Sequence, residues 1–251
     1  MDNELEGRIA LITGAGRGIG AACARAMSKR GADVVINYHH SEQEAADVAA
    51  DVRSHGRRAL VVQADVSKPE QVQAMLEQAQ AEFGQVDILV NNAGRHNHIP
   101  IEQMSMEQWY DIIDTNLTSQ MLCIKAVIPG MKERGWGRIV NLAAMAALKG
   151  SGSGDVSYSG SKAGVLGLTR AIFRPLAQYG ITVNAVAPGP IDTDMVRLGI
   201  DPDRLRGYVS RTPVGRVGRP EEVAELISFL SSDRASYLTG QVISINGGLS
   251  V

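Results

Sequence analysis

The stretch Thr13-Gly14-Ala15-Gly16-Arg17-Gly18-Ile19-Gly20 stands between a short apolar run and a segment with helical spacing. Glycines at such a junction let the backbone turn sharply, bring its N–H groups close to a pyrophosphate, and let the helix pack tightly on the strand. The amino terminus of that helix adds partial positive charge. A strand, a glycine-rich turn and a helix in this order predict a dinucleotide-binding site, with a purely structural glycine turn as the alternative.

Short apolar runs and helical stretches alternate along the whole chain of 251 residues. The strand candidates are 8–13, 33–38, 59–63, 88–91, 138–142, 182–186 and 241–245. The helical stretches include 19–29, 41–54, 70–83, 106–134 and 156–179. Strands that are apolar throughout and followed by helices form parallel sheets covered on both faces. We therefore expect a single-domain, doubly wound α/β Rossmann fold over residues 1–251, with a seven-stranded parallel sheet.

One region interrupts this alternation. Residues 191–218 have weak strand and helix signals and include Pro202 and Pro213. The region is interpreted either as a substrate lid over the carboxyl ends of the strands or as an ordinary connecting loop. Elsewhere four glycines follow helical runs, where left-handed helix ends are expected. They are Gly31, Gly56, Gly84 and Gly180.

Composition excludes several classes of protein. The 25 Lys and Arg against 27 Asp and Glu give a net charge of -2 without a basic block, so nucleic acid is not an expected partner. Cys23 and Cys123 lie far apart with no Cys/His cluster nearby, which argues against a disulfide scaffold and a metal site. No segment approaches the ~18 continuous apolar residues of a membrane span, and the acidic amino terminus lacks an apolar stretch. We expect a cytoplasmic protein with no membrane contact.

The spacing Gly14-x-x-x-Gly18-x-Gly20 resembles the TGxxxGxG of the short-chain dehydrogenase/reductase family. Three further motifs follow in the family's order: Asn91-Asn92-Ala93-Gly94 (NNAG), Tyr158-Ser159-Gly160-Ser161-Lys162 (YxxxK) and Pro188-Gly189. The resemblance covers nearly the whole chain. Within the family it is closest to 3-oxoacyl-(acyl-carrier-protein) reductases and to sugar and polyol dehydrogenases. It implies an oxidoreductase that transfers a hydride between a nicotinamide cofactor and a carbonyl or secondary alcohol.

The resemblance also implies which residues contact the cofactor. The glycine-rich loop would hold the pyrophosphate, the residue pair after the third strand the adenine, and the later motifs the nicotinamide side. The expected cofactor residues are Gly14, Gly16, Arg17, Gly18, Ile19, Gly20, Asn37, Asp65, Val66, Asn92, Ala93, Gly94, Tyr158, Lys162, Pro188, Gly189, Ile191 and Thr193.

The end of the second strand favours NADP(H) over NAD(H). An NAD site usually places an acid there, which accepts hydrogen bonds from the ribose 2′-hydroxyl and repels a 2′-phosphate. Here Tyr38 stands about where the acid would fall, and no acid occurs before Glu42. Arg17 occupies the position from which the family's NADP-preferring members reach the 2′-phosphate. The alternative is a solvated Arg17 and an Asn37 that tolerates either cofactor.

Tyr158 and Lys162 are four residues apart, so on a helix they project from one face. A free tyrosine has a pKa of about 10, and an adjacent ammonium, together with the positive nicotinamide of an oxidised cofactor, lowers the pKa by favouring the phenolate. The resemblance implies that Tyr158 exchanges a proton with the substrate oxygen and that Lys162 also holds the nicotinamide ribose. It further implies that Asn116 positions a water that links Lys162 to solvent. On spacing alone, an exposed helical Tyr–Lys pair is the alternative.

The chain departs from the family pattern at the fifth strand. Asn141-Leu142-Ala143-Ala144-Met145 places Ala144 where family members carry a serine that donates to the substrate carbonyl. Loss of one such donor typically lowers the rate by about 10²- to 10³-fold. Three explanations stay open: a deliberate Ser-to-Ala change, a natural substitution offset by a nearby donor, or a protein that binds nucleotide without turnover. The candidate replacement donors are Ser151, Ser153 and Ser157.

The substrate is expected to be a 3-oxoacyl thioester or similar ketone, with a sugar or polyol as the alternative. The resemblance places Ala144, Met145 and His96 beside it. The carboxyl-terminal run 240–251 and the long helices around Asn116 and Tyr158 resemble segments that family tetramers bury. We therefore expect a homotetramer with two-fold symmetric interfaces.

Overall fold

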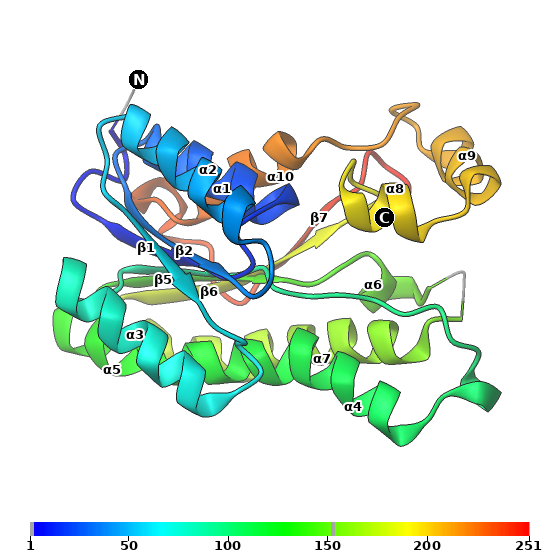
Figure 1. Cartoon of the computed structure of the whole chain (residues 1–251), viewed down its shortest axis with the longest axis horizontal. Helices are drawn as coiled ribbons and strands as arrows, with labels where there is room; N and C mark the ends of the chain where they lie inside the picture. The colour runs from blue at the N-terminus through cyan, green and yellow to red at the C-terminus, as the bar shows by residue number, and fades with distance from the viewer. Residues whose placement is uncertain (1–2, 152–153, 251) are drawn as a thin grey trace.

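The computed structural model describes residues 3–151 and 154–250. Its seven strands form one parallel sheet in the order β3-β2-β1-β4-β5-β6-β7, with helices on both faces (Figure 1). The predicted fold class is therefore confirmed. The chain order reverses beside β1, which pairs with β2 on one side and β4 on the other. Ligands of such sheets bind outside the carboxyl ends of the strands at this reversal.

Each predicted apolar run overlaps one strand. The strands are β1 (Ile9–Ile12), β2 (Asp33–Tyr38), β3 (Ala59–Gln63), β4 (Ile88–Asn91), β5 (Gly137–Leu142), β6 (Ile181–Pro188) and β7 (Val242–Ile245). The five inner strands are buried along their whole length, whereas β3 and β7 are partly exposed. The two edge strands have a neighbour on one side only, which accounts for the difference.

The two largest apolar cores lie on opposite faces of the sheet. The first contains residues such as Met27, Val48 and Ile227, and the second Met75 and Val127. The first face carries α1 (Gly18–Ser28), α2 (Glu42–Ser54) and α10 (Pro220–Leu230); the second carries α3 (Pro69–Phe83), α5 (Ser119–Arg134) and α7 (Val156–Ala177). Within the described ranges no helix combines the length and apolar character that crossing a bilayer requires. All four glycines predicted to end helices have a positive φ.

The predicted helix over 106–134 is divided. It consists of α4 (Met106–Ile113), a π turn (Asp114–Thr118) and α5. Asn116 lies in this π turn, and its side chain is fully buried. Single π turns inside α-helices occur frequently at functional sites, because the extra residue re-aims side chains that a regular helix would misplace.

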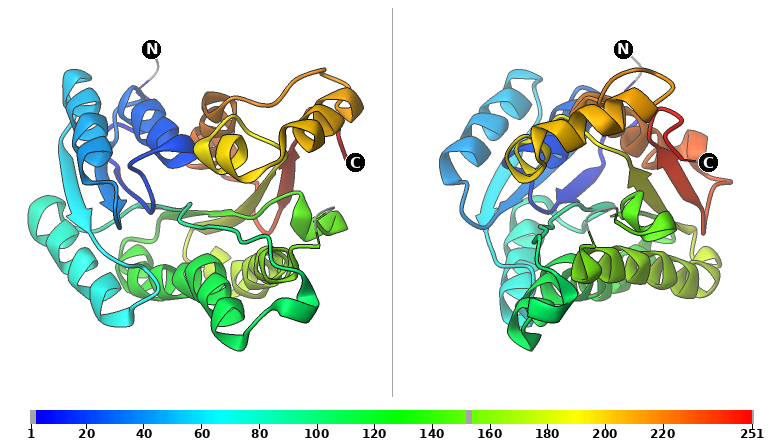
Figure 2. Two further views of the ribbon diagram at one scale, coloured as in Figure 1. Left: turned by 45° about the vertical axis from the view of Figure 1, so that its right-hand side comes forward. Right: turned by 90° about the vertical axis from the view of Figure 1, so that its right-hand side faces the viewer.

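The region 191–218 contains two helices that the sequence signals did not predict. They are α8 (Asp194–Gly199) and α9 (Pro202–Arg211). Pro202 occupies the first helical position of α9, where a backbone N–H would have no partner within the helix. The Asp201 carboxylate accepts hydrogen bonds from the N–H groups of Asp203 and Arg204. Both helices lie beyond the carboxyl ends of the strands, at the same end of the sheet as the short α6 (Ala146–Lys149) (Figures 1 and 2).

Candidate active site

Side chains from the ends of β1, β2 and β4 hold the glycine-rich loop. The N–H of Gly14 donates to Asn37 Oδ1 at 3.1 Å, and the N–H of Ala15 donates to the Asn37 carbonyl at 2.7 Å. Asn92 Nδ2 donates to the carbonyls of Thr13 and Gly14 at 2.9 and 3.0 Å. The loop is therefore fixed on both sides at the point where the strand order reverses.

Glycine is sterically required where this loop enters α1. A Cβ atom on Gly20 would lie 2.5 Å from the Gly14 carbonyl oxygen and 2.6 Å from Asn92 Nδ2. Among the described residues no side chain caps the amino terminus of α1, which begins at Gly18. Uncapped N–H groups at a helix amino terminus favour an anion such as a pyrophosphate. The backbone here fits the dinucleotide that the sequence predicted.

Two of the predicted adenosine-side residues make contacts within the protein. Asn37 is 2% exposed, and its Nδ2 donates to the Ala64 carbonyl at 3.0 Å, so its side chain links the loop to the end of β3. Asp65 Oδ1 accepts from the N–H and the hydroxyl of Ser67 at 2.9 and 2.7 Å. Partial burial raises the pKa of Asp65, but these hydrogen bonds outweigh it and leave the pKa below its ordinary value. Val66, the neighbour of Asp65, is buried.

Arg17 is exposed and directed toward α8. One guanidinium nitrogen lies 3.7 Å from a carboxylate oxygen of Asp194, the first residue of α8. At the end of β2, Tyr38 is buried and the following His39 and His40 are exposed. The predicted contact of Arg17 with a 2′-phosphate stays a prediction.

The turn after β6 brings residues 191–193 against the glycine-rich loop. The Pro188 carbonyl accepts from the N–H of Met145 at 2.8 Å, and the N–H of Gly189 donates to the Ile245 carbonyl at 2.9 Å. Two residues beyond, Ile191 is buried, and Thr193 lies so close to Gly18 that a Cβ there would be 3.3 Å from Thr193 Cγ2.

Tyr158 and Lys162 lie on α7, beside the carboxyl ends of β4 and β5. Lys162 Nζ is 6.0 Å from the centre of the Tyr158 ring and donates to the Leu142 carbonyl at 2.8 Å. The same carbonyl accepts from Gln120 Nε2 at 3.1 Å. A Cβ on Gly94 would lie 3.3 Å from Lys162 Nζ, so the NNAG turn packs directly on this ammonium.

Burial shifts the pKa values of Tyr158 and Lys162 in the directions that favour the uncharged form of each side chain. It raises the pKa of Tyr158 to about 12, with the nearby charge of Asp155 acting in the same direction. It lowers the pKa of Lys162 to about 8. The ammonium and the nicotinamide charge are expected to lower the pKa of Tyr158; in the protein alone, burial raises it instead.

Asn116 joins the NNAG turn to α7. Its Nδ2 donates to the Arg95 carbonyl at 2.8 Å and to Ser161 Oγ at 3.1 Å, and its Oδ1 accepts from the N–H of Arg95 at 2.8 Å. Ser161 Oγ in turn donates to the Tyr158 carbonyl at 2.8 Å. The side chain therefore fixes the NNAG turn against α7, while its predicted part in a water relay stays a prediction.

Comparisons with known proteins agree with this geometry. A family model described as enoyl-(acyl carrier protein) reductase matches residues 14–250. The 3-oxoacyl-[acyl-carrier-protein] reductase FabG of Escherichia coli (strain K12) is 41% identical over 244 residues, which are 97% of this chain and 98% of that protein. The chain is a short-chain dehydrogenase/reductase.

Two other members of the family support this assignment. The 3-oxoacyl-[acyl-carrier-protein] reductase of Synechocystis sp. is 41% identical over 246 residues, 98% of both chains. The crystal structure of a short-chain type dehydrogenase/reductase from Mycobacterium marinum superimposes with a TM-score of 0.93 at 37% identity and covers 99% of this chain and 97% of its own. Membership implies an oxidoreductase that uses an NAD(P) cofactor.

In this short-chain dehydrogenase/reductase, Ala144 follows β5 and is 8% exposed, next to the buried Met145. The two described serines proposed as replacement donors make hydrogen bonds within the protein. Ser157 Oγ donates to Asn97 Oδ1 at 2.9 Å, and Ser151 Oγ donates to Asp155 Oδ2 at 3.2 Å. Ser153 lies outside the described residues.

His96 and Asp155 approach Tyr158 from two elements. The His96 ring lies edge-on to the Tyr158 ring, with 6.1 Å between their centres. Asp155, the N-cap of α7, is 4% exposed and was not among the predicted site residues. The preference for Asp at N-caps, applied three residues before Tyr158, is the signal that could have identified it. Thr13 and Ser161 were likewise missed; Thr13 Oγ1 accepts from the N–H groups of Asn92 and Ala93, both at 3.0 Å.

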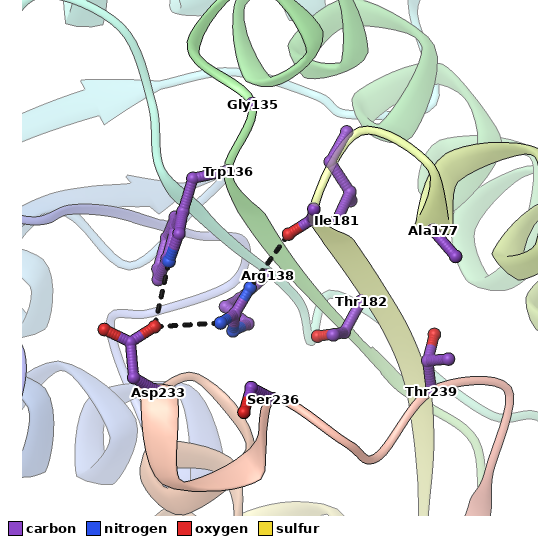
Figure 3. Close-up of a pocket in the computed structure, with 10 residues that line it drawn as sticks. Gly135, Trp136, Arg138, Ala177, Ile181, Thr182, Asp233, Ser236 and Thr239 are labelled. Atoms are coloured by element: carbon purple, nitrogen blue, oxygen red, sulfur yellow. Dashed lines mark hydrogen bonds and ion pairs between the residues drawn. The ribbon is translucent and has the colours of Figure 1, made fainter.

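A cavity among the described residues lies away from this site. It has a volume of about 290 Å³ and opens beside the first residues of β5 and β6, at the amino ends of the strands. Trp136, Arg138 and Asp233 line it and are joined by hydrogen bonds (Figure 3). None of the sequence motifs contributes to it. Within residues 3–151 and 154–250, no group of three or more His, Cys, Asp and Glu side chains is arranged to hold a metal ion.

Proposed function

We propose that this short-chain dehydrogenase/reductase is an NADP(H)-dependent ketoreductase that acts on a 3-oxoacyl thioester or a similar ketone. The observation that carries the proposal is the convergence of Tyr158, Lys162 and Asn116 around Gly94, next to the glycine-rich loop. The names of the curated relatives, two 3-oxoacyl-[acyl-carrier-protein] reductases, support the thioester over a sugar or polyol. The alternative is a protein that binds nucleotide with impaired catalysis, and Ala144 is the observation that favours it.

When bound, the nicotinamide supplies the hydride that reduces the carbonyl carbon. With a pKa raised to about 12 by burial and by Asp155, the Tyr158 hydroxyl is protonated at neutral pH and donates its proton to the carbonyl oxygen. With its pKa at about 8, most of Lys162 is an ammonium at pH 7, and its charge stabilises the phenolate as Tyr158 gives up the proton. These protonation states favour reduction of a ketone over oxidation of an alcohol at neutral pH.

The cofactor residues support NADP(H). No acid directly follows β2, and Arg17 is exposed beside the glycine-rich loop. Its ion pair with Asp194 is exposed on both sides, and such pairs contribute only about 0–1 kcal/mol. The guanidinium can therefore exchange Asp194 for a 2′-phosphate at little cost. The residues around Gly14, Gly18 and Gly20 would hold the pyrophosphate, and Asp65, Pro188, Gly189 and Thr193 would border the two ends of the dinucleotide.

The assembly proposed with this function is a cytoplasmic homotetramer. The edge strand β7 is only partly buried, and Tyr237 just before it is fully exposed. Exposed strand edges and large apolar side chains are typical of interfaces between subunits. Static light scattering at micromolar protein should give four times the 26.8 kDa chain mass, and a monomer would contradict this assembly.

NADPH oxidation with a panel of 3-oxoacyl thioesters, diketones and keto-sugars tests the function. The wild-type protein and Ala144→Ser are assayed together, with NADH as a parallel cofactor. Turnover of thioesters above the other ketones supports the proposal, and preference for keto-sugars would assign the polyol alternative. No turnover by either protein, with NADPH still bound in a fluorescence titration, would leave the nucleotide-binding alternative.

A further inference from the structure

Two histidines after the NNAG turn connect the lid helix α8 to the active site. His96 Nε2 lies 3.2 Å from the Met195 carbonyl, and His98 Nε2 makes a short contact with the Gly199 carbonyl. The two rings lie 4.5 Å apart. Gly199 itself packs on the His96 ring, because a Cβ there would be 2.5 Å from His96 Cε1 and Nε2. Three contacts therefore join this loop to both ends of one short helix.

His98 also contacts the amino terminus of the catalytic helix. Its Nδ1 lies 2.9 Å from Oδ1 of Asp155, the N-cap of α7. Both ring nitrogens of His98 thus face oxygen atoms that can only accept hydrogen bonds: an ionised carboxylate and a backbone carbonyl. A neutral imidazole has one N–H and can donate to one of them, whereas an imidazolium donates to both. The bond to the carboxylate is the stronger of the two, because it is assisted by charge.

Other titratable or charged side chains lie near His98, and one of them pairs with it. Asp155 faces His98 from α7, His96 faces it from the same loop, and Tyr158 lies beyond His96. On α8, the Arg197 guanidinium donates to the Asp192 carboxylate at 2.7 and 2.9 Å. Asp155 is therefore the carboxylate that pairs with His98 among the described contacts, and the Gly199 carbonyl is the lid's contribution.

We propose that His98 is a positioning residue that fastens the lid helix α8 to the catalytic helix α7 when its imidazole carries both protons. Loss of one proton leaves the Asp155 contact and removes the donor to Gly199, so the lid is released. Histidine is the side chain whose charge changes nearest neutral pH. Closure of the active site should therefore weaken as pH rises through neutrality. The proposal rests on the proposed ketoreductase function only in assigning α8 the role of a substrate lid.

Hydrogen exchange of the α8 amides in the cofactor-free full chain tests the fastening without any turnover. In wild type, we expect the protection factors of α8, corrected for intrinsic exchange, to fall at least threefold between pH 6 and pH 8. His98→Gln cannot titrate and should remove this pH dependence, and His98→Phe should give the low protection at both pH values. His55→Gln is the matched control, since His55 contacts Ser28 far from the lid and its replacement should leave the pH dependence of α8 intact.

NMR spectra of the His98 imidazole in wild type test the proposal even if a variant fails to fold. Two-bond ¹H–¹⁵N correlations of wild type at pH 6 should show both His98 nitrogens protonated. A single protonated nitrogen at that pH, α8 protection that does not change with pH, or wild-type pH dependence in a folded His98→Gln would each overturn the proposal.

Steady-state kinetics give a second measurement once a ketone substrate is in hand. Between pH 6 and 7, where most of Lys162 keeps its proton, KM for the ketone should rise in wild type and stay flat in His98→Gln. A residue that only stabilised the fold would lower the activity of the variant equally at every pH. Because exchange and spectra need no substrate, failure of the ketoreductase proposal and failure of the lid proposal give different results.

Discussion

The two ends of the sheet each contain a buried cation, and the two cations have different partners. At the amino end, the Arg138 side chain is 3% exposed and its guanidinium donates to the Asp233 carboxylate at 2.9 Å and to the carbonyls of Gly137 and Gly180 (Figure 3). At the carboxyl end, Lys162 is 4% exposed and donates to the Leu142 carbonyl. In the described part of the chain no carboxylate forms an ion pair with Lys162.

The difference separates a structural cation from a reactive one. Burial lowers the pKa of both groups, but a guanidinium begins far above neutrality and Asp233 opposes the shift, so Arg138 stays charged. The ammonium begins lower and has no such partner, and its pKa falls to about 8. Lys162 therefore changes charge near pH 8, beside Tyr158, the proposed proton donor.

The largest expected effect comes from removing the reactive pair. Tyr158→Phe should lower kcat for the ketone by about 10³-fold, because general acid catalysis contributes about 10²- to 10⁴-fold. Lys162→Met should lower it comparably. Circular dichroism and NADPH titration verify that both variants fold. Retention of more than a tenth of wild-type kcat by Tyr158→Phe would exclude it as the proton donor.

Restoring the missing hydrogen-bond donor should raise the activity. Ala144→Ser adds a hydroxyl beside the substrate oxygen, and turnover should rise at least tenfold. The gain should be in kcat more than in KM, because the hydroxyl stabilises charge that develops in the transition state. Unchanged turnover would show that the absent hydroxyl does not limit the rate.

The rate of ketone reduction should fall above pH 8, by up to about tenfold per pH unit, as Lys162 loses its proton.

The free energy of unfolding should change with pH in the opposite direction. Because the pKa of Lys162 in the folded protein lies below its ordinary 10.5, the unfolded chain binds more protons between pH 8 and 10.5, and this group's contribution to the unfolding free energy rises with pH there. Urea unfolding of wild type against Lys162→Met at pH 7 and pH 9.5 measures the contribution. A wild-type advantage that shrinks toward pH 9.5 would contradict it.

The smallest expected effect is at the amino end. Asp233→Asn removes the charge that pairs with Arg138, and the unfolding free energy should fall by about 1 kcal/mol, less than for a fully buried pair because the Asp233 side chain is 69% exposed. The kcat per folded molecule should not change. A large loss of kcat without loss of stability would mean that the two ends of the sheet are coupled.

Local signals predicted much of the fold and the cofactor loop. The runs 33–38, 59–63 and 88–91 coincide with β2, β3 and β4, because strands covered by helices on both faces of a parallel sheet are mostly apolar, and even the edge strand β3 keeps this character. The glycine-rich loop was recognisable because Gly20 is needed wherever a helix packs this closely on a strand. The helix α9 was missed because Pro202 was read as an interruption, although proline is favoured at a first helical position.

The contacts that shape the candidate site could not be predicted in the same way. The His98–Asp155 contact joins residues 57 positions apart, and the contact of His98 with Gly199 spans 101 positions. No periodicity links such residues; only the packing of α7 and α8 beyond the sheet brings them together. The raised pKa of Tyr158 in the protein alone was not predictable for a related reason, since the depth of burial of its hydroxyl depends on the tertiary structure and not on the spacing to Lys162.

The carbonyl of Leu142 has a consequence for motion at the site. It accepts from two donors, Lys162 Nζ and Gln120 Nε2. A buried carbonyl left without a donor costs about 1–3 kcal/mol. Because Gln120 keeps its hydrogen bond, Lys162 can move away from the Leu142 carbonyl without leaving that oxygen unpaired. A glutamine one helical turn after Asn116 thus gives the lysine freedom to move.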